Sequence, residues 1–203
     1  MGTFHHNTLL LCAFLSLVIL AGLSGCTEKE KKDPYIYDLP DSVHNMLPPA
    51  KGELLFMDYK TVDFVRKGSK DHFVIRVMGP NFLESTVVFE IFGTTGNSLY
   101  RDSFRAFQLL GQTELNLPNP SIQEREEAII NRLKHFFDKD RFRSPAIPSG
   151  QTFVEDVSVD GIWQETAKRK DSVSFYYLIE LDLRIKIVFY PETGKVEVYE
   201  RCC

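Results

Sequence analysis

The sequence predicts an α+β domain, mostly antiparallel β-sheet with one main helix packed on it. Two observations indicate this fold class. Short runs in which apolar and polar residues alternate occur in two groups, and a single amphipathic stretch at about residues 122–138 separates the groups. Strands on both sides of one helix favour an antiparallel sheet that the helix covers. The length of 203 residues and the 43% hydrophobic content exclude a disordered acidic tail, a collagen-like repeat and a disulfide-dense miniprotein.

The first group of alternating runs predicts half-buried antiparallel strands with one face in water. The alternation is clearest at Phe73, Ile75 and Val77. Glycine-containing turns, KGSKD and TTGN, separate neighbouring runs. The expected strands cover residues 53–59, 61–66, 72–78, 85–93 and 98–104.

A helix is expected over residues 122–138. Ser121 and, three residues later, Glu124 have the spacing of a capping box, in which each side chain accepts from the other residue's backbone amide. The apolar residues that follow share one face of a helix, with Ile130 at its edge. They are Ile122, Ile129, Leu133, Phe136 and Phe137.

The second group of runs follows a loop that contains Pro145, Pro148 and Gly150. Residues 191–194, with the sequence PETG, lie between two alternating runs and predict a closing hairpin. Strands are expected at residues 152–159, 161–167, 172–181, 183–190 and 195–200. Residues 52–203 are therefore expected to form one α+β domain.

The amino-terminal segment predicts export. Residues 9–23 contain no charge, and as a helix at 1.5 Å per residue they would span about 22 Å, less than the ~30 Å of a bilayer's hydrocarbon core. This length is typical of a secretory signal. One departure is that residues 1–8 contain no Lys or Arg, although such signals usually begin with positive charge.

Leu23, Ser24, Gly25 and Cys26 close this apolar segment, and the four residues resemble the lipobox of bacterial lipoproteins. The resemblance implies that residues 1–25 are removed as a signal peptide and that Cys26 carries palmitate-type acyl chains, which anchor the protein to a membrane of the cell envelope. The same resemblance implies an outer-membrane destination in a cell with two membranes, because Thr27 follows Cys26 in place of the Asp of a retention signal. The layout also resembles small exported lipoproteins of unassigned function, a likeness that transfers location and no activity.

Residues 26–51 are predicted to form a tether, because they contain alternating charges and four prolines with few apolar runs. The apolar side chains of Tyr35, Ile36, Tyr37 and Leu39 leave a second arrangement open, in which this part packs onto the domain as an irregular arm.

The domain contains no recognisable catalytic motif. It has no nucleophile elbow, phosphate-binding loop or zinc-hydrolase spacing, and His44, His72 and His135 are scattered. The spacing of the acidic residues singles out no acid/base pair. We therefore predict no catalytic residue, no metal and no cofactor. A net charge of −4 also argues against a nucleic-acid partner.

Two groups of residues are weak candidates for a binding site. Trp163, Phe153, Tyr176 and Tyr177 could form an aromatic platform for a sugar or a peptide, although aromatic residues in strands more often belong to the core. The basic residues of segment 132–143 could contact an anionic ligand or lipid headgroups, although a solvated helix end is the favoured interpretation.

The leading functional hypothesis is a lipid-anchored binding or interaction module of the cell envelope, whose partner is an envelope protein or glycan. An envelope hydrolase that acts on glycan or peptide through paired carboxylates is the alternative. A structural subunit of an envelope assembly is a third hypothesis.

Overall fold

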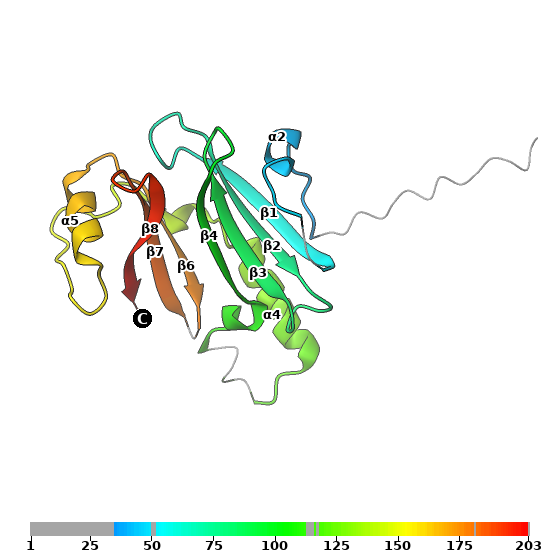
Figure 1. Ribbon diagram of the computed structural model, residues 1–203. Coiled ribbons are helices and arrows are strands. Elements are labelled where there is room, and N and C mark those ends of the chain that lie inside the picture. Colours follow the sequence, from blue (N-terminus) through cyan, green and yellow to red (C-terminus); the bar gives the residue numbers. More distant parts are fainter. Residues whose placement is uncertain (1–34, 50–51, 113–115, 117, 181, 203) are drawn as a thin grey trace, which may run out of the picture. The chain divides into compact units, whose positions relative to one another are not determined.

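Two four-stranded antiparallel sheets make up the computed structural model, which describes residues 35–49, 52–112, 116, 118–180 and 182–202. The expected signal peptide and Cys26 lie outside these residues. The first sheet consists, in spatial order, of β1 (Leu54–Val62), β2 (Asp71–Met78), β3 (Thr86–Phe92) and β4 (Ser98–Arg105). The second consists of β5 (Phe142–Arg143), β6 (Ser174–Ile179), β7 (Leu183–Tyr190) and β8 (Lys195–Cys202). The predicted α+β, mostly antiparallel fold is confirmed (Figure 1).

The helical elements among the described residues lie before, between and within the sheets. They are α2 (Asp41–His44), the 3-10 helix η1 (Ala106–Leu109), α4 (Ile122–Lys134), the 3-10 helix η2 (Lys139–Arg141) and α5 (Asp160–Lys168). Helix α4 connects the two sheets along the chain, and α5 lies in the connection from β5 to β6. Figure 1 shows α4 behind the first sheet and α5 on the outer side of the second.

Most expected strands are present, but the strand expected at residues 61–66 does not exist as a separate element. Strand β1 runs through both of the first two expected strands and ends at Val62. Beyond it, the backbone amides of Phe64 and Val65 donate to a carboxylate oxygen of Asp71, at 3.0 and 2.8 Å. These amides therefore bond with a side chain instead of a neighbouring strand. The TTGN hairpin is confirmed, since the Gly93 amide donates to the Asn97 carbonyl at 2.9 Å.

The strands expected at residues 152–159 and 161–167 are wrong. The second of these segments lies within helix α5, and the first is irregular apart from one bridge, between Ser158 and Glu200. Trp163 and Ala167 are four positions apart, so a helix places both on one face, where they pack in an apolar cluster with Val188. A short apolar run does not distinguish this helix from a strand, and packing against β7 decides it.

The capping box that begins α4 is confirmed. The Glu124 amide donates to the Ser121 hydroxyl at 3.2 Å, and the Ser121 amide donates to the Glu124 carboxylate at 2.7 Å. The helix ends at Lys134, earlier than residue 138. The expected face is buried at Ile129 and Leu133, but Ile122 is 70% exposed. The first turn of α4 lies beyond the strand ends in Figure 1, so its apolar side chain has no sheet to cover.

One aromatic cluster joins both sheets and the segment after α4. The Phe89 ring from β3 lies 5.3 Å from that of Phe136, and 5.5 Å from the rings of Phe175 and Tyr177 on β6. The Phe73 ring of β2 lies 5.4 Å from the Phe175 ring. All five side chains are almost completely buried. The inner faces of both sheets therefore share one hydrophobic core.

The outer face of the first sheet is covered by an arm formed by residues 35–49. The arm pairs with β1, where the Met57 amide donates to the Tyr35 carbonyl at 3.0 Å. Val43 is fully buried against Val74 and Phe92. The packed arm, one of the two arrangements open from the sequence, is therefore the one present. The expectation that this sheet has one face in water is wrong for the strands that the arm covers.

A short chain of hydroxyl groups also links the two sheets. The buried Tyr177 hydroxyl of β6 donates to a carboxylate oxygen of Asp102 on β4 at 2.5 Å, and lies 2.8 Å from the Tyr100 hydroxyl. Burial raises the pKa of Tyr177 well above its usual range and that of Tyr100 to about 12. Both phenols are therefore protonated at neutral pH.

Within the described residues, no helix is both long enough and apolar enough to cross a bilayer.

Replacing Tyr177 with Phe should destabilise the fold by about 1–3 kcal/mol, because it leaves Asp102 and Tyr100 without a buried partner. The free energy of unfolding in urea measures this loss. The adjacent substitution Tyr176→Phe is a matched control and should change stability by less than about 0.5 kcal/mol. Equal stability of the two variants would show that the hydroxyl chain does not hold the sheets together.

Candidate functional site

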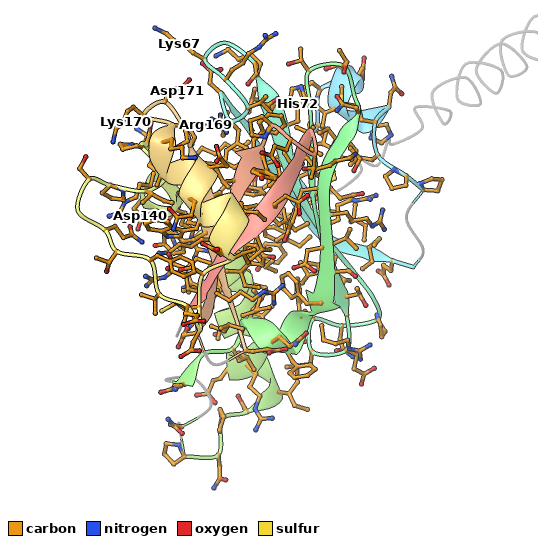
Figure 2. The ribbon with its side chains drawn as sticks, turned by 60° about the vertical axis from the view of Figure 1, so that its left-hand side comes forward. Lys67, His72, Asp140, Arg169, Lys170 and Asp171 are labelled. Carbon is orange, nitrogen blue, oxygen red and sulfur yellow. The ribbon has the colours of Figure 1, made fainter. Side chains whose placement is uncertain are left out.

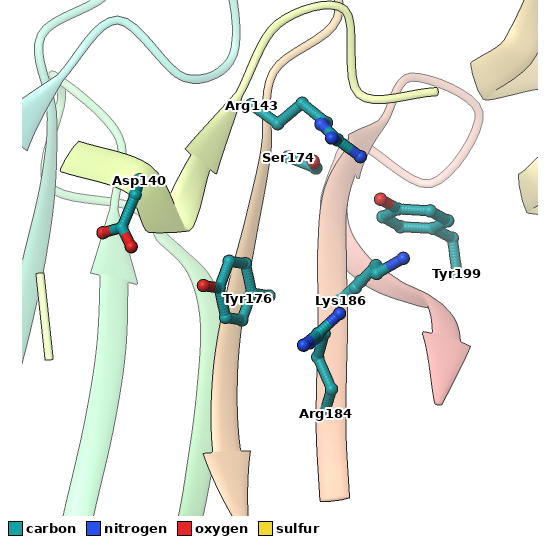
Figure 3. Close-up of a pocket in the computed structure, with 7 residues that line it drawn as sticks. All are labelled: Asp140, Arg143, Ser174, Tyr176, Arg184, Lys186 and Tyr199. Carbon is teal, nitrogen blue, oxygen red and sulfur yellow. The ribbon is translucent and has the colours of Figure 1, made fainter. Parts of the chain in front are cut away.

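A polar pocket of about 300 Å³ lies on the outer face of the second sheet. Side chains alternate between the faces of a strand, so the residues next to the core residues Phe175, Ile185 and Ile187 point outward. The pocket is lined by Asp140, Arg143, Ser174, Tyr176, Arg184, Lys186 and Tyr199 (Figure 3). Helix α5 covers a neighbouring part of the same face, against β7 and β8 (Figure 2).

Two buried hydroxyl groups, from Ser174 on β6 and Tyr199 on β8, form the floor of the pocket. The Tyr199 hydroxyl donates to the Ala146 carbonyl at 3.3 Å. Burial raises the pKa of Tyr199 to about 12, so the phenol is protonated at neutral pH. The floor therefore offers neutral hydrogen-bonding groups.

Lys186 in the pocket already has an acidic partner. Its ammonium group binds Oε1 of Glu200, on the neighbouring strand β8. Oε2 of Glu200 accepts from the side-chain amide of Gln151 at 3.2 Å. The side chains of Lys186 and Glu200 are only 15% and 8% exposed. This ion pair therefore belongs to the structure of the sheet and adds no net charge to the pocket.

Arg143 and Arg184 have no such partner. Both side chains are exposed, and within the part of the chain that the structure describes neither forms an ion pair or a side-chain hydrogen bond. The Arg184 guanidinium lies 5.0 Å from the centre of the Tyr176 ring, and Arg141 lies 6.0 Å from the same ring. Asp140 is the one carboxylate among the residues that line the pocket, and it lies on the side of Tyr176 away from Arg184 (Figure 3).

This arrangement is suited to binding an anion. Guanidinium groups are permanently charged and present several donors in a plane, which matches the oxygens of carboxylate and phosphate groups. The hydroxyl groups of the floor supply further donors and acceptors. The lining therefore combines two arginines that form no ion pair with neutral polar groups and with one carboxylate, that of Asp140.

The structure brings Trp163 and Phe153 together but does not unite all four aromatic residues predicted from the sequence. Tyr176 lies in the pocket, whereas Tyr177, the next residue on β6, points into the core. Trp163 is 6% exposed in α5 and packs edge-on against Phe153, with 5.7 Å between ring centres. An aromatic platform made of Trp163, Tyr176 and Tyr177 is therefore not formed.

The basic segment 132–143 contributes to the pocket in part. Arg132 pairs with Asp182 at 2.7 Å, and the Lys134 ammonium lies 5.0 Å from the centre of the Tyr35 ring. Arg143 lines the pocket, and Arg141 lies over the ring of Tyr176. Sequence reasoning missed Arg184 and Lys186, although their alternation with Ile185 and Ile187 predicts that both cations share the outer face of β7.

No pair of carboxylates lines any of three cavities formed by described residues. Besides the pocket with Asp140, one cavity is lined by the loops near Asp71, and another by Arg76 and Arg101 on the first sheet. The Asp71 carboxylate is already occupied by backbone amides. Nor do the residues described here include a group of three or more His, Cys, Asp or Glu side chains that could hold a metal ion.

Comparison with known proteins adds no family to this description: no family model, no curated protein and no solved structure matches the chain.

The substitution Lys186→Met should destabilise the fold by about 3 kcal/mol or more, because Glu200 would keep a nearly buried charge without its cation. Arg184→Met, two residues away on the same face, should cost less than about 1 kcal/mol, since it removes only an exposed cation–π contact. Thermal unfolding of both variants measures the difference. Similar losses of stability in the two variants would contradict the conclusion that Lys186 is a structural cation and Arg184 is available to a ligand.

Proposed function

We propose that this chain is a lipid-anchored binding module of the cell envelope, and that the pocket on the second sheet binds an anionic ligand. The observation that carries the proposal is the pair of exposed guanidinium groups, Arg143 and Arg184, which lack an acidic partner among the described residues and lie on one hollow surface. Two arginines of the first sheet, Arg76 and Arg101, differ from them, because both pair with Glu90.

The folding energetics support a ligand role for these two residues. Lys186 and Glu200 stabilise the sheet through a pair that is nearly buried, whereas Arg143 and Arg184 form no such contact. An exposed cation without a partner contributes little to stability. Two of them beside buried hydroxyl groups instead provide the donors that a carboxylate, sulfate or phosphate group requires.

The location in the proposal comes from the sequence. The lipobox-like residues Leu23, Ser24, Gly25 and Cys26 support acylation of Cys26 and attachment to the envelope, with the outer membrane favoured in a cell that has two membranes. Two or more acyl chains give stable attachment, where one alone is marginal.

The alternative function is an envelope hydrolase. Hydrolysis of a glycosidic bond by two carboxyl groups requires them to lie about 5–9.5 Å apart around the bond. The pocket offers Asp140, while Glu200 is held by Lys186. Cleavage of the oligogalacturonate used in the binding experiment of the next subsection would favour this alternative.

The substitution Cys26→Ser should release the protein from the membrane fraction, because Ser has no thiol to acylate. Fractionation of a bacterial host that expresses the full chain, with mass spectrometry of the product, measures this. The matched variant Cys202→Ser should remain in the membrane with the acyl mass. An unmodified Cys26, or the same distribution for Cys26→Ser and the unchanged chain, would overturn the anchor.

Inorganic phosphate should raise the melting temperature of the full chain more than chloride does at equal ionic strength, because binding to the folded state stabilises it. The double substitution Arg143→Gln with Arg184→Gln should abolish this difference. Lys67→Gln removes an exposed cation at a distance from the pocket and should leave the difference unchanged (Figure 2). A phosphate effect that survives in the double variant would exclude the pocket as the site.

A further inference from the structure

We propose that the ligand is a segment of an acidic polysaccharide, whose negative groups on different sugar units contact Arg143 and Arg184 separately. This inference rests on the proposed function and specifies the ligand class of the same pocket. It depends on the spacing of the two arginines, on the neutral groups between them and on the state of the Tyr176 ring in the lining.

The two guanidinium groups lie against different strands. That of Arg184 is stacked on Tyr176 of β6. Arg143 and Tyr199 of β8 both line the pocket, and Figure 3 shows the Arg143 side chain at the opposite end of the pocket from Arg184. Strands β6 and β8 flank β7, so the two tyrosine positions are two strand spacings, about 10 Å, apart.

The backbone gives a second measure of the separation, between the two arginines themselves. Arg143 pairs with Ser174, and Ser174 pairs with Val188, which lies four residues from Arg184 along β7. At about 3.3 Å per residue along the strands and about 4.8 Å between strands, the two arginine Cα atoms are about 16 Å apart on a diagonal. As they stand, the two side chains lie at opposite ends of the pocket (Figure 3), so a chain with repeated charges is suited to contact both.

The surface between the cations is polar and neutral. It carries the Tyr176 hydroxyl and the ion pair between Lys186 and Glu200, above the buried hydroxyl groups of Ser174 and Tyr199. The Tyr176 hydroxyl forms no hydrogen bond with the described residues. Such a surface suits the hydroxyl groups of sugar rings, which both donate and accept. Asp140, beyond Tyr176, disfavours an anionic group on that side.

A single-stranded nucleic acid also carries repeated charges, but this pocket lacks what such a ligand uses. Proteins bind single strands by stacking bases on open aromatic rings along a basic groove. The guanidinium groups of Arg184 and Arg141 already lie over the Tyr176 ring, and Tyr199 is 1% exposed.

The test measures binding of the full chain, purified in detergent, to oligogalacturonates of one and six sugar units by calorimetry. Six-unit maltose oligomer is the neutral control and six-unit oligothymidylate is the nucleic-acid control. We expect the six-unit acid to bind at least about tenfold more tightly than the single unit, because the second contact is intramolecular. Arg143→Gln and Arg184→Gln should each remove this advantage, whereas Lys67→Gln should retain it.

Each other outcome has a defined meaning. Equal affinity for one and six units would overturn the polysaccharide inference and leave the anion-binding function standing. Tight binding of oligothymidylate or of the neutral oligomer would also overturn it. If neither galacturonate nor inorganic phosphate binds, both the inference and the proposed function fail. Melting temperatures of the arginine variants establish that they are folded, as their exposed positions lead us to expect.

Discussion

The packing of Phe89 against Phe175, Tyr177 and Phe136 is the contact on which the rest of the structure depends. Each sheet has only four strands, and neither could bury its inner face without the other and the segment after α4. Complete burial of one such aromatic side chain stabilises a fold by roughly 1.5–3 kcal/mol. Because the inner faces of both sheets belong to one core, the alternation of side chains along the strands fixes which residues face outward. The candidate pocket is formed by these outward-facing residues of the second sheet.

The charged residues of the two sheets have different roles, and burial separates them. Arg76 with Glu90, and Lys186 with Glu200, are pairs in which each charge is removed from water and needs its partner. Such pairs add little net stability, but loss of one member is costly. Arg143 and Arg184 remain in water without a partner among the described residues, so they are available to a ligand at no cost to the fold.

Because of the arm, the folded unit begins before residue 52, which shortens the segment that would connect it to a lipid on Cys26. Residues 35–49 pack on the first sheet, so Tyr35, nine positions after Cys26, is already bound to β1. Nine fully extended residues span at most about 32 Å. An acylated Cys26 would therefore keep Tyr35 within that distance of its lipid.

The amino-acid sequence by itself determined the class of fold, the start of α4 and most strands of both sheets, because these depend on local chemistry: the reciprocal cap of Ser121 and Glu124, the alternation around Ile75 and the turn at residues 191–194. It also placed Arg143 in a basic segment. Local patterns could not separate Tyr176 from Tyr177, or decide whether residues 160–168 form a strand or a helix. Arg143 and Arg184 are 41 positions apart in the sequence, and only strand pairing, with the shared aromatic core that orients the second sheet, places both on one surface.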